Sequence, residues 1–309
     1  MSLRRFVIFL IGLCFIPIWL AACNKNSPVS TSTPTVVETS GGQVVSPEPF
    51  STPIAPTSTP VPLAAVVNGE GITLAEFEAE VARFQAATTI SGTLLATDTT
   101  TTVLGELIDQ TLLAQAAVKN GYSVDDTILQ SRMNALEDQI GGTQALIDWE
   151  TAHGYQGEEF TLALKQSIEA AWMRDQITAA VPEKAEEVHV LQILVPTSTE
   201  ADQIYSDLQS GDDFLTLATS YDPLTHGDLG WFPRGYLSDT KIEEAAFALQ
   251  VSKYSPVIQT EVGYHILYLL ERDPERTLQP QARRALQARA LQDWLNAQRQ
   301  QSQIQILVP

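Results

Sequence analysis

The chain has 309 residues, which is enough for two modest domains and flexible tails. Hydrophobic residues make up 44% of it, so packed cores are possible. The 37 acidic residues outnumber the 18 basic ones and give a net charge of −19, which argues against nucleic-acid binding because phosphates need basic surface.

The N-terminus has the pattern of an export signal. Arg4 and Arg5 precede an apolar stretch, residues 6–22, that ends at Cys23. Its last part, Leu20-Ala21-Ala22-Cys23, resembles the lipobox of bacterial lipoproteins, which implies removal of residues 1–22 and a diacylglycerol on the Cys23 sulfur. The alternative is a plain transmembrane anchor, for which 17 residues are somewhat short.

Residues 23–63 are predicted to be a disordered linker. Of the 39 residues from 24 to 62, 8 are Pro and 14 are Ser or Thr. Such a composition buries too little apolar surface to offset the entropy of ordering. The linker therefore holds the folded part away from the membrane.

Residues 64–181 are predicted to form a helical domain. It opens with a short strand that ends in the turn Asn68-Gly69, followed by the capping box Thr73-x-x-Glu76. Phe77, Val81 and Phe84 then recur at helical spacing. Further helices are expected around residues 103–121, 123–140, 145–153 and 158–177.

The pattern changes at Pro182, and residues 182–273 are predicted to be a compact α+β unit. Strands are expected at 188–195, 257–260 and 264–270, with helices at 200–209, 213–220 and 242–249. Residues 274–309 are predicted to form one long helix and a strand, in which Ile304, Ile306 and Val308 alternate. We expect this tail to return to the first domain and to pair with Val66-Val67.

Three ordered motifs lie in the second unit. They are Gly227-Asp228-Leu229-Gly230-Trp231-Phe232, then Glu243-Glu244-Ala245-Ala246-Phe247-Ala248-Leu249, then Gly263-Tyr264-His265-Ile266. Together they resemble the parvulin-type rotamase domain, a peptidyl-prolyl cis-trans isomerase. The helical region, with Val67-Asn68-Gly69-Glu70 and Glu76-Phe77, is similar to the N-terminal domain of SurA and PrsA-type foldases. The whole arrangement resembles the PrsA-type foldase lipoproteins.

This resemblance implies an α+β fold in two parts. One is an all-helical SurA/PrsA-like N-terminal domain completed by the C-terminal helix. The other is a parvulin domain with a four-stranded antiparallel sheet and surrounding helices. It also implies an extracytoplasmic protein of the cell envelope, lipid-anchored at Cys23, whose partners are unfolded or partly folded exported polypeptides.

The resemblance implies a proline pocket made of apolar side chains. Its members are Leu229, Leu237 and Ile242, with Phe232 and Phe247 nearby. An X-Pro bond rotates over a barrier of about 18–20 kcal/mol, so an enzyme must hold the proline ring and stabilise the twisted amide. The alternative is that these side chains are ordinary core. Ile242 is a departure, since the family usually has an aromatic residue there.

The resemblance also implies a polar network of Gln192, Asp222, Thr260 and His265. The family's first histidine is absent, and its position is occupied by Gln192. His189 cannot easily replace it, since residues 189 and 192 of a strand point to opposite faces. Glutamine donates and accepts hydrogen bonds but has no imidazole tautomers. If the histidine pair only supports the network, activity is reduced; if it is essential, activity is lost.

Two functions follow. The first is an isomerase and foldase that assists the folding of exported proteins. The second is a catalytically impaired holdase chaperone that binds unfolded chains through the helical domain. A purely structural envelope lipoprotein is disfavoured by the rotamase motifs. We expect no cofactor and no metal, because both cysteines lie within the first 23 residues and the four histidines lack metal-ligand spacing.

Overall fold

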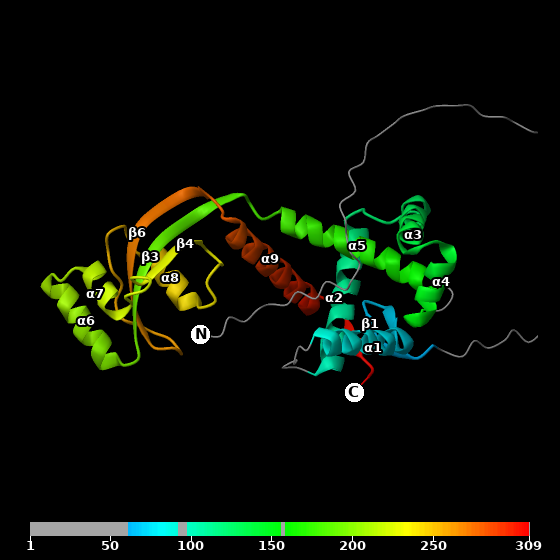
Figure 1. Ribbon diagram of the computed structural model, residues 1–309, viewed down its shortest axis with the longest axis horizontal. Helices are drawn as coiled ribbons and strands as arrows, with labels where there is room; N and C mark the ends of the chain where they lie inside the picture. The colour runs from blue at the N-terminus through cyan, green and yellow to red at the C-terminus, as the bar shows by residue number, and fades with distance from the viewer. Residues whose placement is uncertain (1–60, 92–97, 156–157, 309) are drawn as a thin grey trace, which may run out of the picture. The chain divides into compact units, whose positions relative to one another are not determined.

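A computed structural model describes residues 61–91, 98–155 and 158–308. The predicted signal segment, most of the predicted linker and Cys23 lie outside the described residues. The described part contains a helical domain and a second domain built around a four-stranded sheet (Figure 1). None of the helices in this part is both long and apolar enough to cross a membrane.

The helical domain opens with a hairpin and continues as a series of helices. Its elements are β1 (Leu63–Val67), β2 (Glu70–Thr73), α1 (Leu74–Ser91), α2 (Thr99–Lys119), α3 (Asp126–Ile140), α4 (Thr143–Ala152) and α5 (Glu159–Ala179). Asn68 and Gly69 turn the hairpin with φ angles of 53° and 89°. The Glu76 N–H donates to the Thr73 hydroxyl (3.1 Å), and the Glu76 carboxylate accepts from the Thr73 N–H, so the capping box is formed.

One apolar core joins the hairpin to α1 and α2. Phe77 and Phe84 from α1 pack with Val103 and Ile108 from α2, and each is less than a tenth exposed. Helix α5 has 21 residues and lies close to the bounds predicted from the sequence, 158–177. It lies against α2, where Ala170 contacts the core.

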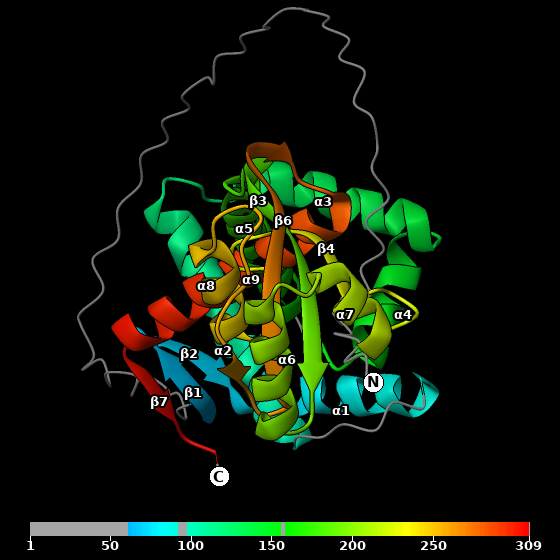
Figure 2. The same cartoon turned by 90° about the vertical axis from the view of Figure 1, so that its left-hand side faces the viewer.

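The C-terminal segment belongs to the helical domain. It consists of α9 (Pro280–Gln301) and β7 (Ile304–Ile306). Leu295 of α9 packs with Leu113 of α2 and Ala170 of α5. Strand β7 pairs antiparallel with β1 and gives a three-stranded sheet in the order β2-β1-β7, which Figure 2 shows at the blue hairpin.

The alternation predicted for the last residues holds only in part. Ile304 and Val308 pack against the core, but Ile306 is 58% exposed. Strand β7 ends at Ile306, so the alternation of side chains does not extend to Val308. Val308 packs on the core from the chain that follows the strand.

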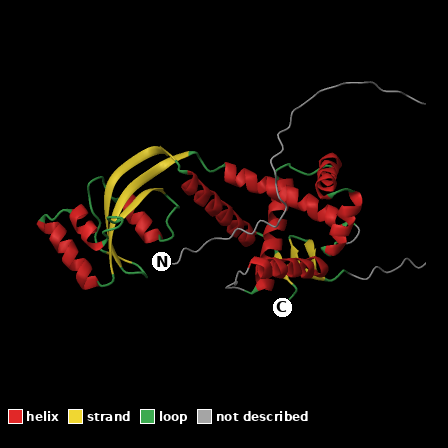
Figure 3. Cartoon of the chain, in the orientation of Figure 1, coloured by secondary structure: helices red, strands yellow, loops and turns green. Residues whose placement is uncertain are grey.

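The second domain has a sheet with helices on both faces (Figure 3). Its elements are β3 (Lys184–Val195), α6 (Ser198–Ser210), α7 (Phe214–Tyr221), β4 (Asp228–Pro233), α8 (Thr240–Ala248), β5 (Ile258–Gln259) and β6 (Tyr264–Thr277). The order is β4-β3-β6-β5, and all neighbours are antiparallel. Strand β6 runs past the predicted end at residue 270 because it pairs with β3 as far as Lys184.

Strand β3 contributes to both faces of this sheet. Leu191 and Ile193 pack against α6 and α7, whereas Val188 and Val190 pack with α8. Side chains alternate along a strand, so Val188 and Val190 face one core while Leu191 and Ile193 face the other. The sheet thus separates two apolar cores, and the polar residues singled out by sequence lie at one end of it.

Candidate active site

Three of the four polar residues predicted from the sequence come together at one end of the sheet. Gln192 is on β3, His265 is the second residue of β6, and Thr260 follows β5. Antiparallel pairing places Leu194 opposite His265 and Ile258 opposite the same residue. The three side chains are therefore brought together by neighbouring strands.

The imidazole of His265 is hydrogen-bonded on both sides. Its Nε2 lies 2.9 Å from the Thr260 hydroxyl, and its Nδ1 lies 3.1 Å from Oε1 of Gln192. An amide oxygen only accepts, so in this arrangement Nδ1 carries the proton and Nε2 accepts from Thr260. Gln192 thus satisfies the histidine from the position where the parvulin family has its first histidine.

His265 is 5% exposed, and burial lowers its pKa because the charged form loses solvation. The negative charge of Asp239 acts in the opposite direction and is the smaller effect. The imidazole is therefore neutral at pH 7. A neutral ring has one donor and one acceptor, which matches its two partners.

Two glycines let the backbone approach this network. A Cβ on Gly263 would lie 2.6 Å from the carbonyl oxygen of Val195, and one on Gly227 would lie 2.1 Å from that of Gln192. The Gln192 N–H donates to the Gly227 carbonyl oxygen (2.7 Å). Gly227 therefore fixes the main chain of Gln192. From the sequence motif alone, its glycines indicate only a tight turn.

Asp222, the fourth predicted polar residue, caps the turn after α7. Its carboxylate accepts from the N–H groups of Leu224 and Thr225, both at 3.1 Å, and from the Thr225 hydroxyl. These hydrogen bonds, with that of the Thr225 hydroxyl the strongest, lower the pKa of Asp222. It therefore stays ionised, and its partners are in its own turn rather than at His265.

A cavity of about 240 Å³ joins Asp222 to the network. Gln192, Tyr221, Asp222 and Leu229 are among its lining residues. Gln192 thus contacts His265 through its amide and also lines the cavity that Asp222 and Leu229 line.

The apolar residues predicted for the proline pocket form one cluster. Phe232, Ile242 and Phe247 are buried, and the rings of Phe232 and Phe247 meet edge to face with centroids 6.1 Å apart. Leu229 and Leu237 pack on this cluster and stay partly exposed. Leu229 and Leu237 therefore offer contact surface, and the two phenylalanines support them from below.

Glu243 opens the second of the three sequence motifs, but no role was predicted for it. Its carboxylate is 9% exposed and accepts from the N–H of Gly235 (2.8 Å) and of Leu237 (3.1 Å). It thereby fixes the loop that carries Leu237. The signal for such a role was the position of this acid in α8, between Ile242 and Ala246, which are both buried.

Two further predictions were examined. Cys23, the predicted lipidation site, lies outside the described residues. Within the described ranges, no group of three or more His, Cys, Asp or Glu side chains is placed to hold a metal ion.

Comparison with protein families matches two parts of the chain. Residues 177–271 match the PPIC-type PPIASE domain, and residues 55–145 match the SurA-like N-terminal domain. The first match contains Gln192, Asp222, Thr260 and His265.

The chain is similar to proteins named as foldases and chaperones. The chain is 32% identical to the foldase protein PrsA of Caldanaerobacter subterraneus subsp. tengcongensis over 234 residues, which cover 66% of this chain and 72% of the relative. It is 34% identical to the chaperone SurA of Burkholderia thailandensis over 155 residues, which cover 43% of this chain and 34% of SurA. The crystal structure of PrsA from Bacillus cereus aligns with 77% of this chain and 89% of its own length, at 21% identity and a TM-score of 0.44.

Proposed function

The chain belongs to the PrsA-type foldases, and we propose that it assists the folding of exported polypeptides through prolyl isomerisation at Gln192, Thr260 and His265. Its second domain is a parvulin-type peptidyl-prolyl cis-trans isomerase domain. The observation that carries the proposal is the pair of hydrogen bonds to His265, which persists although a glutamine replaces the family's first histidine.

Isomerisation of an X-Pro bond breaks no covalent bond. The planar amide must lose its resonance, and uncatalysed exchange takes tens of seconds or longer. We assign the grip on the proline ring to Leu229 and Leu237, backed by Ile242 and the two phenylalanines. Because Ile242 lacks the flat face that an aromatic ring offers to a proline ring, the grip should be looser than in relatives with an aromatic residue there.

The ionised Asp222 favours the twisted amide electrostatically. Resonance places negative charge on the oxygen of a planar amide, and twisting removes it. A fixed carboxylate beside the carbonyl oxygen therefore disfavours the planar form relative to the twisted one. Asp222 borders the same cavity as Gln192, which is where we expect the carbonyl group of a bound X-Pro segment to lie.

His265 and Thr260 are assigned to positioning. Thr260 orients the imidazole through Nε2, and Gln192 orients it through Nδ1. The neutral ring adds no positive charge at this end of the sheet, where Asp222 stays ionised. No cofactor is required for this chemistry.

We further propose that the protein acts outside the cytoplasm and is anchored through lipid on Cys23. The support is the sequence ending Leu20-Ala21-Ala22-Cys23 and the Pro- and Ser/Thr-rich stretch after it. Two or more acyl chains hold a protein firmly on a bilayer. Radiolabelled palmitate should be incorporated into the wild-type protein and not into the Cys23→Ala variant; equal labelling would contradict the anchor.

The isomerase proposal is tested by the rate of cis-to-trans exchange of an X-Ala-Pro-Phe peptide. We expect the purified full chain, in non-ionic detergent, to accelerate exchange, and His265→Ala to slow it by at least tenfold at unchanged far-ultraviolet circular dichroism. Gln192→His tests whether the missing histidine limits the rate. An inert wild type that still suppresses aggregation of an unfolded protein would replace the proposal with the holdase alternative.

A further inference from the structure

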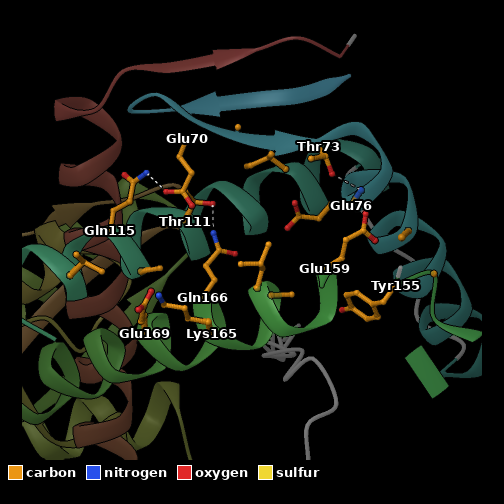
Figure 4. A pocket seen from close by; sticks show the side chains of 18 of the residues that line it. Glu70, Thr73, Glu76, Thr111, Gln115, Tyr155, Glu159, Lys165, Gln166 and Glu169 are labelled. Carbon is orange, nitrogen blue, oxygen red and sulfur yellow. Dashed lines mark hydrogen bonds between the residues drawn. The ribbon is translucent and has the colours of Figure 1, made fainter. Parts of the chain in front are cut away.

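The helical domain contains a cleft of about 600 Å³, which is larger than the cavity of about 240 Å³ at Gln192. Figure 4 shows it between β2, α1, α2 and α5. A volume of this size accommodates a side chain together with a short stretch of its main chain. The cleft is not part of the isomerase site, and no sequence motif pointed to it.

Aliphatic side chains from β2, α1, α2 and α5 line the cleft and together form its apolar wall. Ile72, Ala79, Ala114 and Ala163 line it, and Leu162 is 63% exposed. Small and aliphatic residues of this kind leave a smooth surface for a hydrocarbon stem. They provide no specificity for charge, which must come from the polar residues of the cleft.

Acidic residues are in excess among those polar groups. The acids that line the cleft are Glu70, Glu76, Glu159 and Glu169, and the bases are Arg83 and Lys165. Arg83 is paired with Glu80 at 2.6 Å and donates to the His153 carbonyl oxygen. Its guanidinium also lies over the ring of Tyr155, 4.8 Å from the centroid. The cleft therefore has negative character overall.

Glu169 and Glu70 accept hydrogen bonds from other elements of the domain. Glu169 is 6% exposed and accepts from the Val124 N–H (3.1 Å), and Glu70 accepts from the Gln115 amide (2.8 Å). In Figure 4, Glu76 and Glu159 lie at the end of the cleft near Tyr155, away from Glu70 and Gln115. That end combines two carboxylates with an aromatic ring.

Glu76 is held in place by the capping box with Thr73. Burial is the main influence on its carboxyl group and raises its pKa; Glu80 and Glu70 raise it further, and Arg83 only partly offsets this. A carboxylate in such surroundings gains from an added positive charge. A guest cation at this end would supply it.

We propose that this cleft binds a lysine or arginine side chain of an unfolded client polypeptide. The aliphatic stem lies along the apolar wall, and the cationic head reaches Glu76 and Glu159. Long basic side chains combine these two features, with an apolar stem and a charged tip. The inference rests on the proposed function, because it gives the helical domain a client preference: a basic residue flanked by aliphatic ones.

The occupant is a separate molecule rather than the chain's own N-terminal segment. Residues 24–60 contain one basic residue, Lys25, and two acids, Glu38 and Glu48. Such a segment matches an acidic cleft poorly.

The test is fluorescence anisotropy with the full chain and a labelled peptide, Gly-Ser-Ala-Leu-Lys-Leu-Ala-Ser-Gly, which lacks proline and so does not engage the isomerase site. We expect it to bind about fivefold more tightly than the same peptide with methionine in place of lysine, the gain typical of one partly exposed ion pair. Glu76→Gln should remove this preference while keeping the capping box, which accepts glutamine. Lys165→Gln should tighten binding of the lysine peptide.

Glu78→Gln is the matched control, since Glu78 is exposed on the same helix and does not line the cleft. Equal affinity for the lysine and methionine peptides, or equal effects of Glu76→Gln and Glu78→Gln, would overturn the inference. So would displacement of the lysine peptide by free putrescine at equal molar concentration, since the site would then take a small amine and not a chain. Prolyl exchange and aggregation suppression are measured on the same samples. If both persist, only this inference has failed; if both are absent, the proposed function has failed.

Discussion

Gly227 and Gly230 make a matched pair for testing how tightly the main chain is packed at Gln192. They have nearly the same φ, 72° and 71°, and lie three residues apart at the start of β4. A Cβ on Gly230 meets nothing within 4 Å, whereas one on Gly227 lies 2.1 Å from the Gln192 carbonyl oxygen. Substituting each by alanine therefore separates conformational strain from steric conflict.

The expected costs follow from these contacts. Left-handed backbone costs a residue with a Cβ about 1–2 kcal/mol, and this is all that Gly230→Ala loses. Gly227→Ala loses the same amount and must also move two main-chain segments apart, which costs about 1–3 kcal/mol as overpacking does. The shift also breaks the hydrogen bond from the Gln192 N–H to the Gly227 carbonyl oxygen, worth about 1 kcal/mol. We expect Gly227→Ala to be the more destabilising by about 2–4 kcal/mol.

The assay is urea unfolding of the full chain, followed by tryptophan fluorescence, with prolyl exchange measured on the same variants. Gly230→Ala should keep most of its isomerase activity. Gly227→Ala should lose activity even where it is still folded, because the amide of Gln192 leaves its position at His265. Equal unfolding midpoints for the two variants would refute the close approach on which this reasoning depends.

Three further predictions follow from the structure. Because burial lowers the pKa of His265, the unfolded chain binds a proton before the folded one as the pH falls below about 6.5. The plateau of kcat/KM should therefore extend below that pH. The free energy of unfolding should decline as the pH falls below about 6.5 in the wild type, and this decline should be absent in His265→Gln. Burial raises the pKa of Glu76, so the folded state binds a proton at this carboxyl more readily than the unfolded state does. Glu76→Gln should therefore melt a few degrees higher than the wild type at pH 7. Calorimetry should show this difference in melting temperature closing by pH 4. Deleting residues 304–309 removes the β7 pairing and the packing of Ile304 and Val308, so urea unfolding should show a loss of about 2–4 kcal/mol, whereas Ile306→Ser should change stability by less than about 0.5 kcal/mol.

Local sequence signals predicted the elements whose cause is local. Asn68-Gly69 requires two positive φ angles, and Thr73-x-x-Glu76 closes a ring of two hydrogen bonds within one turn. Such features need no information about distant parts of the chain. For the same reason the helical stripe of Phe77, Val81 and Phe84 faces the core as its spacing predicted.

Features that depend on a distant partner were less well predicted. The length of β6 depends on how far β3 runs beside it, so the sequence pattern ended this strand too early, at residue 270. The third helix begins at Asp126 with Asp125 as its cap, because the Ser123 side chain turns to Glu169 instead. Such contacts join residues far apart in sequence, so periodicity does not contain them.

The same division applies to the site. The family resemblance predicted that Gln192, Thr260 and His265 form one network, and their side chains are in hydrogen-bond contact; their roles stay a prediction. The resemblance did not indicate that Asp222 would be held by its own turn, or that Glu243 would fix the loop at Leu237. Both depend on which main-chain N–H groups face a carboxylate, and only the folded chain determines that.

The replacement of a histidine by Gln192 has a definite chemical consequence. Two neighbouring imidazoles share a proton in either of two directions, because each nitrogen donates or accepts. Opposite the amide oxygen of Gln192, the ring of His265 is confined to the tautomer with hydrogen on Nδ1, and Thr260 must donate to Nε2. A network that only orients groups loses nothing by this restriction, whereas one that relays a proton stops. Isomerisation of an amide needs no net proton transfer, so a fixed tautomer is compatible with the activity of the domain, and Gln192→His should change its rate far less than His265→Ala does.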